Sequence, residues 1–150
     1  MTIAYYDCLV SENFFRYDFC SEGPKGKIRK VISFTLVNLQ WTFYYNLAFG
    51  DVDKDGGVND FVNSNDQDAE KVLATVAQAV IAFTNMNPDA LIFAEGNTPS
   101  RTRRYQMGIN KFWKDIEPDF IVFGLLKDKG FEPFRSGINY IGFACKRKKK

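Results

Sequence analysis

A short segment of the chain combines a helix start with three arginines. Thr98 is a typical N-cap, Pro99 suits the first helical position, and basic residues occupy the turns that follow. The first turn of a helix leaves backbone N–H groups unpaired and carries about half a positive charge. Guanidinium groups beside those donors make a place for an anion. The sequence therefore predicts an anion-binding site whose members are Asn97, Ser100, Arg101, Arg103, Arg104 and Tyr105.

Two other interpretations of the arginine cluster stay open. The guanidinium groups could pair with carboxylates of the chain as a structural network, or they could form an exposed helix face that binds nothing. Three arginines in the first turns oppose the helix dipole, so they lack a local stabilising reason. Such an unfavourable placement of positive charge indicates that a negatively charged group compensates it. The carboxylates considered as internal partners are Asp60, Asp66, Asp68 and Glu70.

The absence of histidine limits the chemistry. The chain contains no His, which excludes Ser-His and Cys-His nucleophile pairs and zinc sites built on imidazole. Tyr105 could act as a general acid, but it shares a helical stripe with Ile109, Phe112 and Trp113, so we expect it to pack in the core.

The predicted function is a non-catalytic binding domain for an anionic ligand, namely a nucleotide, a nucleic-acid backbone or an acidic partner. No cofactor is predicted.

An acidic segment resembles the opening of a calcium-binding loop. Alternating aspartates from Asp51 to Asp55 and a glycine at the sixth position match an EF-hand-type loop. The twelfth position, where a Glu would bind calcium with both oxygens, is Val62, and an aromatic strand rather than a helix comes before the loop. We interpret residues 50–66 as a solvated loop between a strand and a helix and predict no metal site. Calcium binding there stays an alternative.

Length and composition indicate one domain. A chain of 150 residues can bury about 70% of its unfolded surface, which is enough for a core without a metal or a disulfide. We expect an α+β domain at residues 1–145 and a disordered basic tail at residues 146–150. Cys8, Cys20 and Cys145 are an odd number without a C-x-x-C pair, which favours reduced thiols in the cytoplasm. No stretch approaches the ~20 apolar residues that cross a bilayer, so we expect no membrane partner.

Alternating apolar residues predict the strands that surround the site. The alternation covers residues 14–20, 28–37 and 41–49 and is typical of half-buried antiparallel strands. The segments between predicted elements, residues 21–26 and 127–133, are interpreted as connections. Three further strands are predicted at residues 90–94, 120–126 and 138–145.

Two helices are predicted in addition to the strands of the mixed sheet. Ser64 and Gln67 form a capping box that opens a long helix, and Asn85 begins the segment that ends it. Its core-facing stripe is expected to comprise Val72, Leu73, Val76, Ala77, Val80 and Phe83. The second helix is predicted to begin at Thr98–Pro99 and to continue to Ile116.

The resulting order, β-β-β-α-β-α-β-β, resembles the acetyltransferase-type fold of the GNAT superfamily. Asn97, Ser100 and Tyr105 lie in positions similar to an Asn-containing break and a helix tyrosine of that fold. The resemblance implies an alternative function, a diverged acyltransferase that uses a coenzyme A thioester, with Tyr105 as proton donor and main-chain amides near residues 91–94 holding the pantetheine arm. The glycine-rich phosphate turn of that fold is missing; residues 63–66 stand in its place.

Three segments are similar to a family of short, uncharacterised bacterial proteins known as a domain of unknown function. They are residues 45–51, 71–76 and 100–106. The resemblance spans most of the chain and implies no activity. It implies that the acidic loop, the long helix and the arginine-rich helix belong to one unit.

Overall fold

A long hairpin of β3 (Gly26–Leu39) and β4 (Thr42–Val52) contributes to both compact units into which the chain divides. The two units are Met1–Thr35 with Ala48–Met86, and Leu36–Leu47 with Asn87–Lys150. The computed structural model describes residues 4–24, 26–52, 58–59, 69–95 and 99–149.

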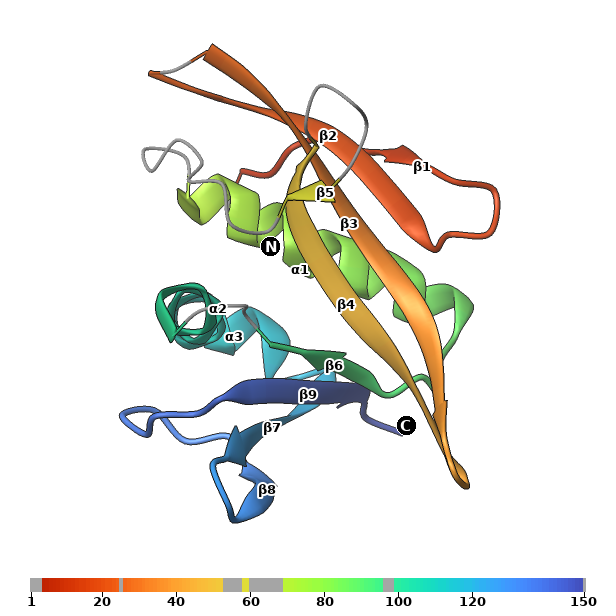
Figure 1. Ribbon diagram of the computed structural model, residues 1–150, viewed down its shortest axis with the longest axis vertical. Coiled ribbons are helices and arrows are strands. Elements are labelled where there is room, and N and C mark those ends of the chain that lie inside the picture. Colours follow the sequence, from red (N-terminus) through yellow and green to blue (C-terminus); the bar gives the residue numbers. More distant parts are fainter. Residues whose placement is uncertain (1–3, 25, 53–57, 60–68, 96–98, 150) are drawn as a thin grey trace. The chain divides into compact units, whose positions relative to one another are not determined.

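The first unit is a small antiparallel sheet with one helix. Its elements are β1 (Leu9–Val10), β2 (Arg16–Gly23), the first part of β3, the end of β4, β5 (Val58–Asn59) and α1 (Ala69–Met86). β2 pairs with β1 on one side and with β3 on the other, and α1 lies against one face of these strands (Figure 1).

Aromatic side chains fill the space between that sheet face and α1. Tyr17 lies opposite Ile32 in the β2–β3 ladder, and both are buried. The Phe83 ring of α1 stacks on the Phe34 ring, with their centroids 4.2 Å apart. The Tyr6 N–H donates to Thr75 Oγ1 of α1 at 2.8 Å, which joins the segment before β1 to the helix. The helix face toward the core thus contains Thr75 and Phe83 of the first unit.

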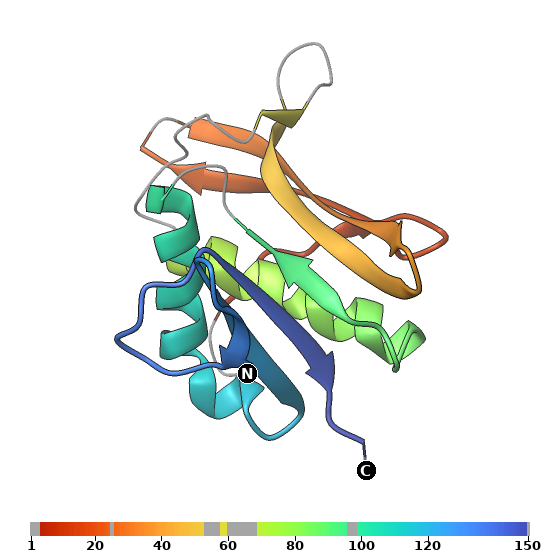
Figure 2. The same ribbon diagram turned by 60° about the horizontal axis from the view of Figure 1, so that its bottom comes forward.

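The second unit contains the hairpin end of β3 and β4 together with the C-terminal elements. These are β6 (Ile92–Ala94), α2 (Pro99–Lys111), α3 (Trp113–Ile116), β7 (Phe120–Leu126), β8 (Gly130–Pro133) and β9 (Gly142–Arg147). β9 lies between β6 and β7, antiparallel to both (Figure 2). β6 is parallel to β4, with Tyr45 opposite Ile92.

The hydrogen-bonded strands follow the order β1-β2-β3-β4-β6-β9-β7-β8, with β5 paired to β4. This confirms the predicted α+β class with a mostly antiparallel mixed sheet, since β4 and β6 are parallel whereas β1–β2, β2–β3, β6–β9, β7–β9 and β7–β8 are antiparallel. The likeness to the acetyltransferase-type fold stays a prediction.

The prediction of one helix as far as Ile116 was wrong, because two helices cover this stretch. α2 ends at Lys111, and α3 begins at Trp113. Between them Phe112 has φ −98° and ψ 15°, close to the sparsely populated bridge region rather than to α-helical values. Phe112 is nearly fully buried. Its side chain is therefore part of the core at the point where the helical geometry is interrupted.

The predicted strand limits also need correction. Residues 130–133, interpreted as a connection, form β8. β4 extends through Asp51, which was expected in the acidic loop, and β9 includes Lys146 and Arg147. These last two residues were expected in a disordered tail, but they pair with Ile121 and Phe120 of β7. The β7–β9 ladder shows why, since β7 begins at Phe120 and offers partners for a strand of that length.

Candidate anion site at the start of α2

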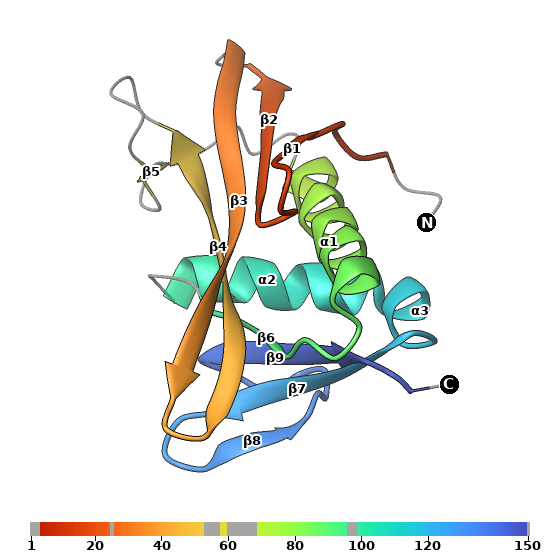
Figure 3. The same cartoon turned by 90° about the vertical axis from the view of Figure 1, so that its right-hand side faces the viewer.

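The described residues of the predicted site differ in exposure along one helix, α2. Figure 3 shows this helix lengthwise. Ser100 and Arg103 are exposed, Arg104 is half-buried, and Tyr105 is buried. The backbone of Arg101 belongs to α2, but its side chain lies outside the described residues, as does all of Asn97. The structure therefore locates four of the six side chains and assigns Tyr105 to the covered side of the helix.

The covered side of α2 is a narrow stripe. Thr102, Tyr105 and Gly108 are buried at three-residue spacing, and Phe112 follows one turn later. The Gln106 side-chain amide donates to the Ile138 carbonyl, so the helix is also held to the segment before β9. In this position the Tyr105 ring belongs to the packed face of the helix, and Arg103 points to water.

The charged residues at the start of α2 are all positive. Its first turn contains no acidic residue, although carboxylates there would interact favourably with the helix dipole. Arg103 makes no ion pair with any carboxylate in the part of the chain that the structure describes, and Arg104 has contacts within the protein. Of the carboxylates considered as internal partners, Asp60, Asp66 and Asp68 lie outside the described residues.

A second polar cluster in the same unit was not found by sequence reasoning. The Arg135 guanidinium donates to both carboxylate oxygens of Glu132, at 3.0 and 3.1 Å, and the Tyr140 hydroxyl donates to Glu132 Oε2. The Arg135 N–H in turn donates to the Tyr140 oxygen at 3.0 Å. The Tyr140 hydroxyl and Arg135 hold the pKa of Glu132 below its usual range, while burial and the nearby carboxylate raise the pKa of Tyr140. No spacing rule marks these residues, because each lies in an irregular connection or on a short strand.

This cluster depends on close packing between Tyr140 and Gly124 of β7. A Cβ atom built on Gly124 would lie 2.4 Å from the Tyr140 ring. We expect Gly124→Ala to lower the free energy of unfolding by about 1–3 kcal/mol, because the ring has to move and its hydrogen bond to Glu132 is lost. Urea unfolding followed by circular dichroism measures the change. Ile121→Ala, at an exposed position of the same strand, is the control, and an equal loss in both variants would contradict the packing argument.

A buried ion pair in the first unit corrects the interpretation of Asp51. Lys30 Nζ contacts Asp51 Oδ1, and the two residues are 1% and 4% exposed. The Lys30 ammonium also lies 5.7 Å from the centroid of the Phe49 ring. Asp51 was predicted to lie in a solvated loop, with the first position of a calcium loop as the alternative. In the structure its Oδ1 instead contacts an ammonium group.

The rest of the calcium-loop prediction cannot be followed in the structure. Residues 53–57 and 60–68 lie outside the described residues. Among the residues that are described, no group of three or more His, Cys, Asp or Glu could hold a metal ion. Within the same residues, no helix has the length and apolar character needed to cross a membrane.

Fold and site together define an α+β protein whose mixed sheet is accompanied by a helix with an arginine-rich start. The chain belongs to a family of unknown function, DUF6934, whose model matches residues 2–148. This confirms the resemblance to a domain of unknown function. A search of the curated proteins found no significant match, and a search of the solved structures found none either.

Proposed function

We propose that the protein is a non-catalytic binding domain that holds an anionic group at the start of α2. One observation carries the proposal: the first six residues of α2 include three arginines, its first turn contains no acidic residue, and Arg103 is exposed to water. A helix start supplies N–H donors and positive potential to a bound phosphate or carboxylate. Guanidinium groups add bidentate, charge-assisted hydrogen bonds to such an anion.

The ligand chemistry we propose is a phosphate-bearing molecule, either a nucleotide or the backbone of a nucleic acid. An arginine fork matches the geometry of phosphate oxygens, and binding to a polyanion releases counterions. We further propose that the protein works in the bacterial cytoplasm, where an odd number of thiols without a paired motif remains reduced. The acyltransferase function remains the alternative. It requires the protein to bind a coenzyme A thioester and not only a phosphate group.

A titration with arginine variants tests the anion site. We expect a fluorescein-labelled 20-nucleotide single strand to bind the intact chain, and Arg103→Ala to weaken binding about 10-fold or more, because a hydrogen bond to a charged group contributes about 1.5–3 kcal/mol. Fluorescence anisotropy over 50–200 mM salt measures the affinity. We expect it to fall steeply with salt, with a smaller slope in Arg103→Ala.

The control is Lys114→Ala, which removes one exposed positive charge from α3. Equal weakening by Lys114→Ala would indicate a diffuse basic surface rather than the α2 site, and salt-independent binding would contradict the proposal. Titrations with inorganic pyrophosphate and with acetyl-coenzyme A separate the ligand classes. Heat released only with acetyl-coenzyme A would favour the acyltransferase alternative.

A further inference from the structure

The hairpin end of β3 leaves one edge of a strand open. β2 accompanies β3 only as far as the pair Arg16–Ser33, followed by the hydrogen bond from the Phe34 N–H to the Phe15 carbonyl at 2.8 Å. Beyond that point β3 continues to Leu39. Among the described residues, β4 is its one strand neighbour there. One side of residues 35–39 therefore has no strand beside it.

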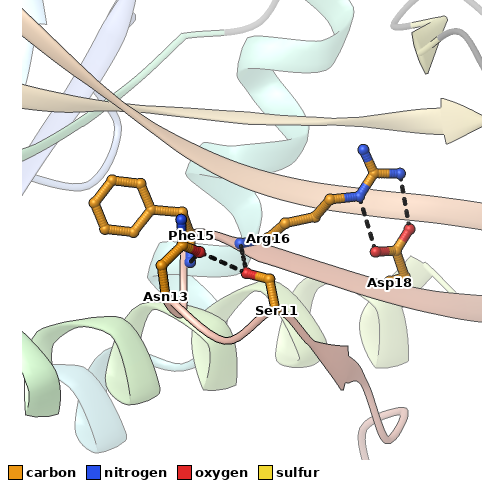
Figure 4. Close-up of polar contacts among 5 residues, drawn as sticks. All are labelled: Ser11, Asn13, Phe15, Arg16 and Asp18. Atoms are coloured by element: carbon orange, nitrogen blue, oxygen red, sulfur yellow. Dashed lines mark hydrogen bonds and ion pairs between the residues drawn. The ribbon is translucent and has the colours of Figure 1, made fainter.

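The turn before β2 explains why that strand cannot continue along the open edge. The Arg16 N–H donates to Ser11 Oγ at 3.0 Å, and the Phe15 N–H donates to Asn13 Oδ1 at 3.0 Å. The Ser11 N–H also donates to the Arg16 carbonyl at 2.9 Å. Figure 4 shows these side chains closing the turn, with the Arg16–Asp18 ion pair beside it on β2. The chain thus turns back at Ser11, and β2 has no continuation that pairs with β3 beyond Phe34.

The polar groups on the open edge can be assigned from the β2 register. In an antiparallel ladder, the backbone N–H and C=O of alternate residues point to the same side of the strand. Because the Phe34 N–H points toward β2, those of Leu36 and Asn38 point to the same side, where β2 no longer runs. Among the described residues no strand pairs with these backbone groups, while the groups of Val37 point toward β4.

The side chains around this edge are uncharged, and several large apolar ones among them are exposed. Trp41 is 95% exposed, Leu39 64%, Phe43 60% and Leu36 50%. Residues 31–50 contain no Asp, Glu, Lys, Arg or Pro, in a chain in which charged residues make up 25%. Proteins usually protect an exposed edge strand with charge, proline or a bulge. The absence of the first two from this segment points to an edge that pairs with another strand.

We propose that this edge pairs with the same edge of a second copy of the chain, in an antiparallel two-fold arrangement centred on Val37. In that register Leu36 lies opposite Asn38 of the second copy. The backbone N–H and C=O groups of these two residues, which point to the open edge, then form closely spaced pairs of hydrogen bonds. A two-fold axis places identical residues near each other, so a charged edge would repel itself. The uncharged edge of residues 35–39 meets its copy without like charges, and the exposed leucines gain cover from water. The pairing is independent of the anion site on α2.

Sedimentation velocity on the full chain tests the pairing. We expect a monomer–dimer equilibrium at micromolar concentrations, and we expect Asn38→Pro to shift it to monomer by at least 10-fold in the dissociation constant. Proline removes the N–H that faces the open edge, a position at which a proline is tolerated in a strand. An intact chain that stays monomeric at 100 µM would overturn the proposal. So would a dimer that Asn38→Pro does not weaken, provided its circular dichroism melt is unchanged.

Cysteine variants test the register even if the proline variant fails to fold. In the background Cys20→Ser, which removes the exposed thiol, Val37→Cys is expected to form an intermolecular disulfide with diamide at pH 8. Opposed residues at the two-fold axis have Cα atoms about 4.5 Å apart, within disulfide range, whereas residue 39 lies about 13 Å from its counterpart. Leu39→Cys is therefore the matched control. Equal cross-linking of both variants would overturn the register.

The two remaining thiols do not interfere with that experiment. Burial raises the pKa of Cys8 to about 11 and that of Cys145 to about 12. At pH 8 both are therefore protonated and react slowly, because the thiolate is the nucleophile.

A last experiment adds vesicles of phosphatidylcholine and phosphatidylglycerol to the full chain. Sedimentation of monomer with the vesicles, without any dimer in their absence, would assign the apolar hairpin to a membrane surface and overturn the proposal.

Discussion

Lys30→Met is expected to lower the free energy of unfolding by about 3–5 kcal/mol, because it leaves the Asp51 carboxylate buried without its partner. The effect is large since both residues are almost entirely inaccessible to water. In addition, Asp51 Oδ2 has no hydrogen-bond partner in the part of the chain that is described. Removing the ammonium would leave a charge with no compensating group on either oxygen.

Two further variants separate this pair from an ordinary surface ion pair. Lys27 and Glu22 lie in the same β2–β3 ladder, 3.7 Å apart, with side chains that are 75% and 65% exposed. Lys27→Met is expected to change stability by no more than about 1 kcal/mol. The double variant Lys30→Met/Asp51→Leu should recover much of the loss, because a well-packed apolar pair of similar volume replaces a buried ion pair at little net cost. Urea unfolding measures all three. A Lys30→Met variant as stable as Lys27→Met would show that Asp51 finds water or another partner.

The position of Asp51 shows where sequence reasoning stopped. Alternation of apolar residues correctly predicts the middle of β3 and β4, since period-two patterning is a local property of a strand. Asp51 breaks that alternation and is followed by further acidic residues, so the pattern indicates a loop. Its partner is Lys30, which lies 21 residues earlier on the neighbouring strand. A charge compensated across two strands leaves no signal in either segment alone.

The helix containing the arginines shows a similar division. Its start at Pro99 is predicted by N-cap chemistry, and β7 is predicted at its observed limits. The break at Phe112 is not predicted, because the apolar spacing continues through it to Ile116. Burial of the Phe112 side chain is a tertiary effect that overrides local propensity. The Glu132–Tyr140 contact is equally invisible, since it needs the register of β7 and β8.

Within the candidate site, sequence alone could place Arg103 and Tyr105 on different sides of one helix. It could not determine whether carboxylates from elsewhere neutralise the arginines, because such contacts join distant segments. The structure narrows this question at Arg103, which is exposed and has no ion pair among the described residues. The titration of Arg103→Ala against Lys114→Ala therefore addresses the one property on which the proposed function depends.

Phe83→Ala is expected to lower the free energy of unfolding by about 3–5 kcal/mol, the range for truncating a buried aromatic side chain. The Phe83 side chain is fully buried. Its ring stacks on Phe34 and meets the edge of Phe15, with centroids 5.4 Å apart in the second pair. Loss of the ring leaves a cavity between α1 and the sheet, and the flanking rings can refill it only in part. Met86→Ala, at an exposed position of α1, is the control and should change stability by less than about 0.5 kcal/mol. Urea unfolding of both variants measures the two losses of stability. We expect packing of the Phe83 face to hold α1 on the strands, and equal losses in the two variants would contradict this.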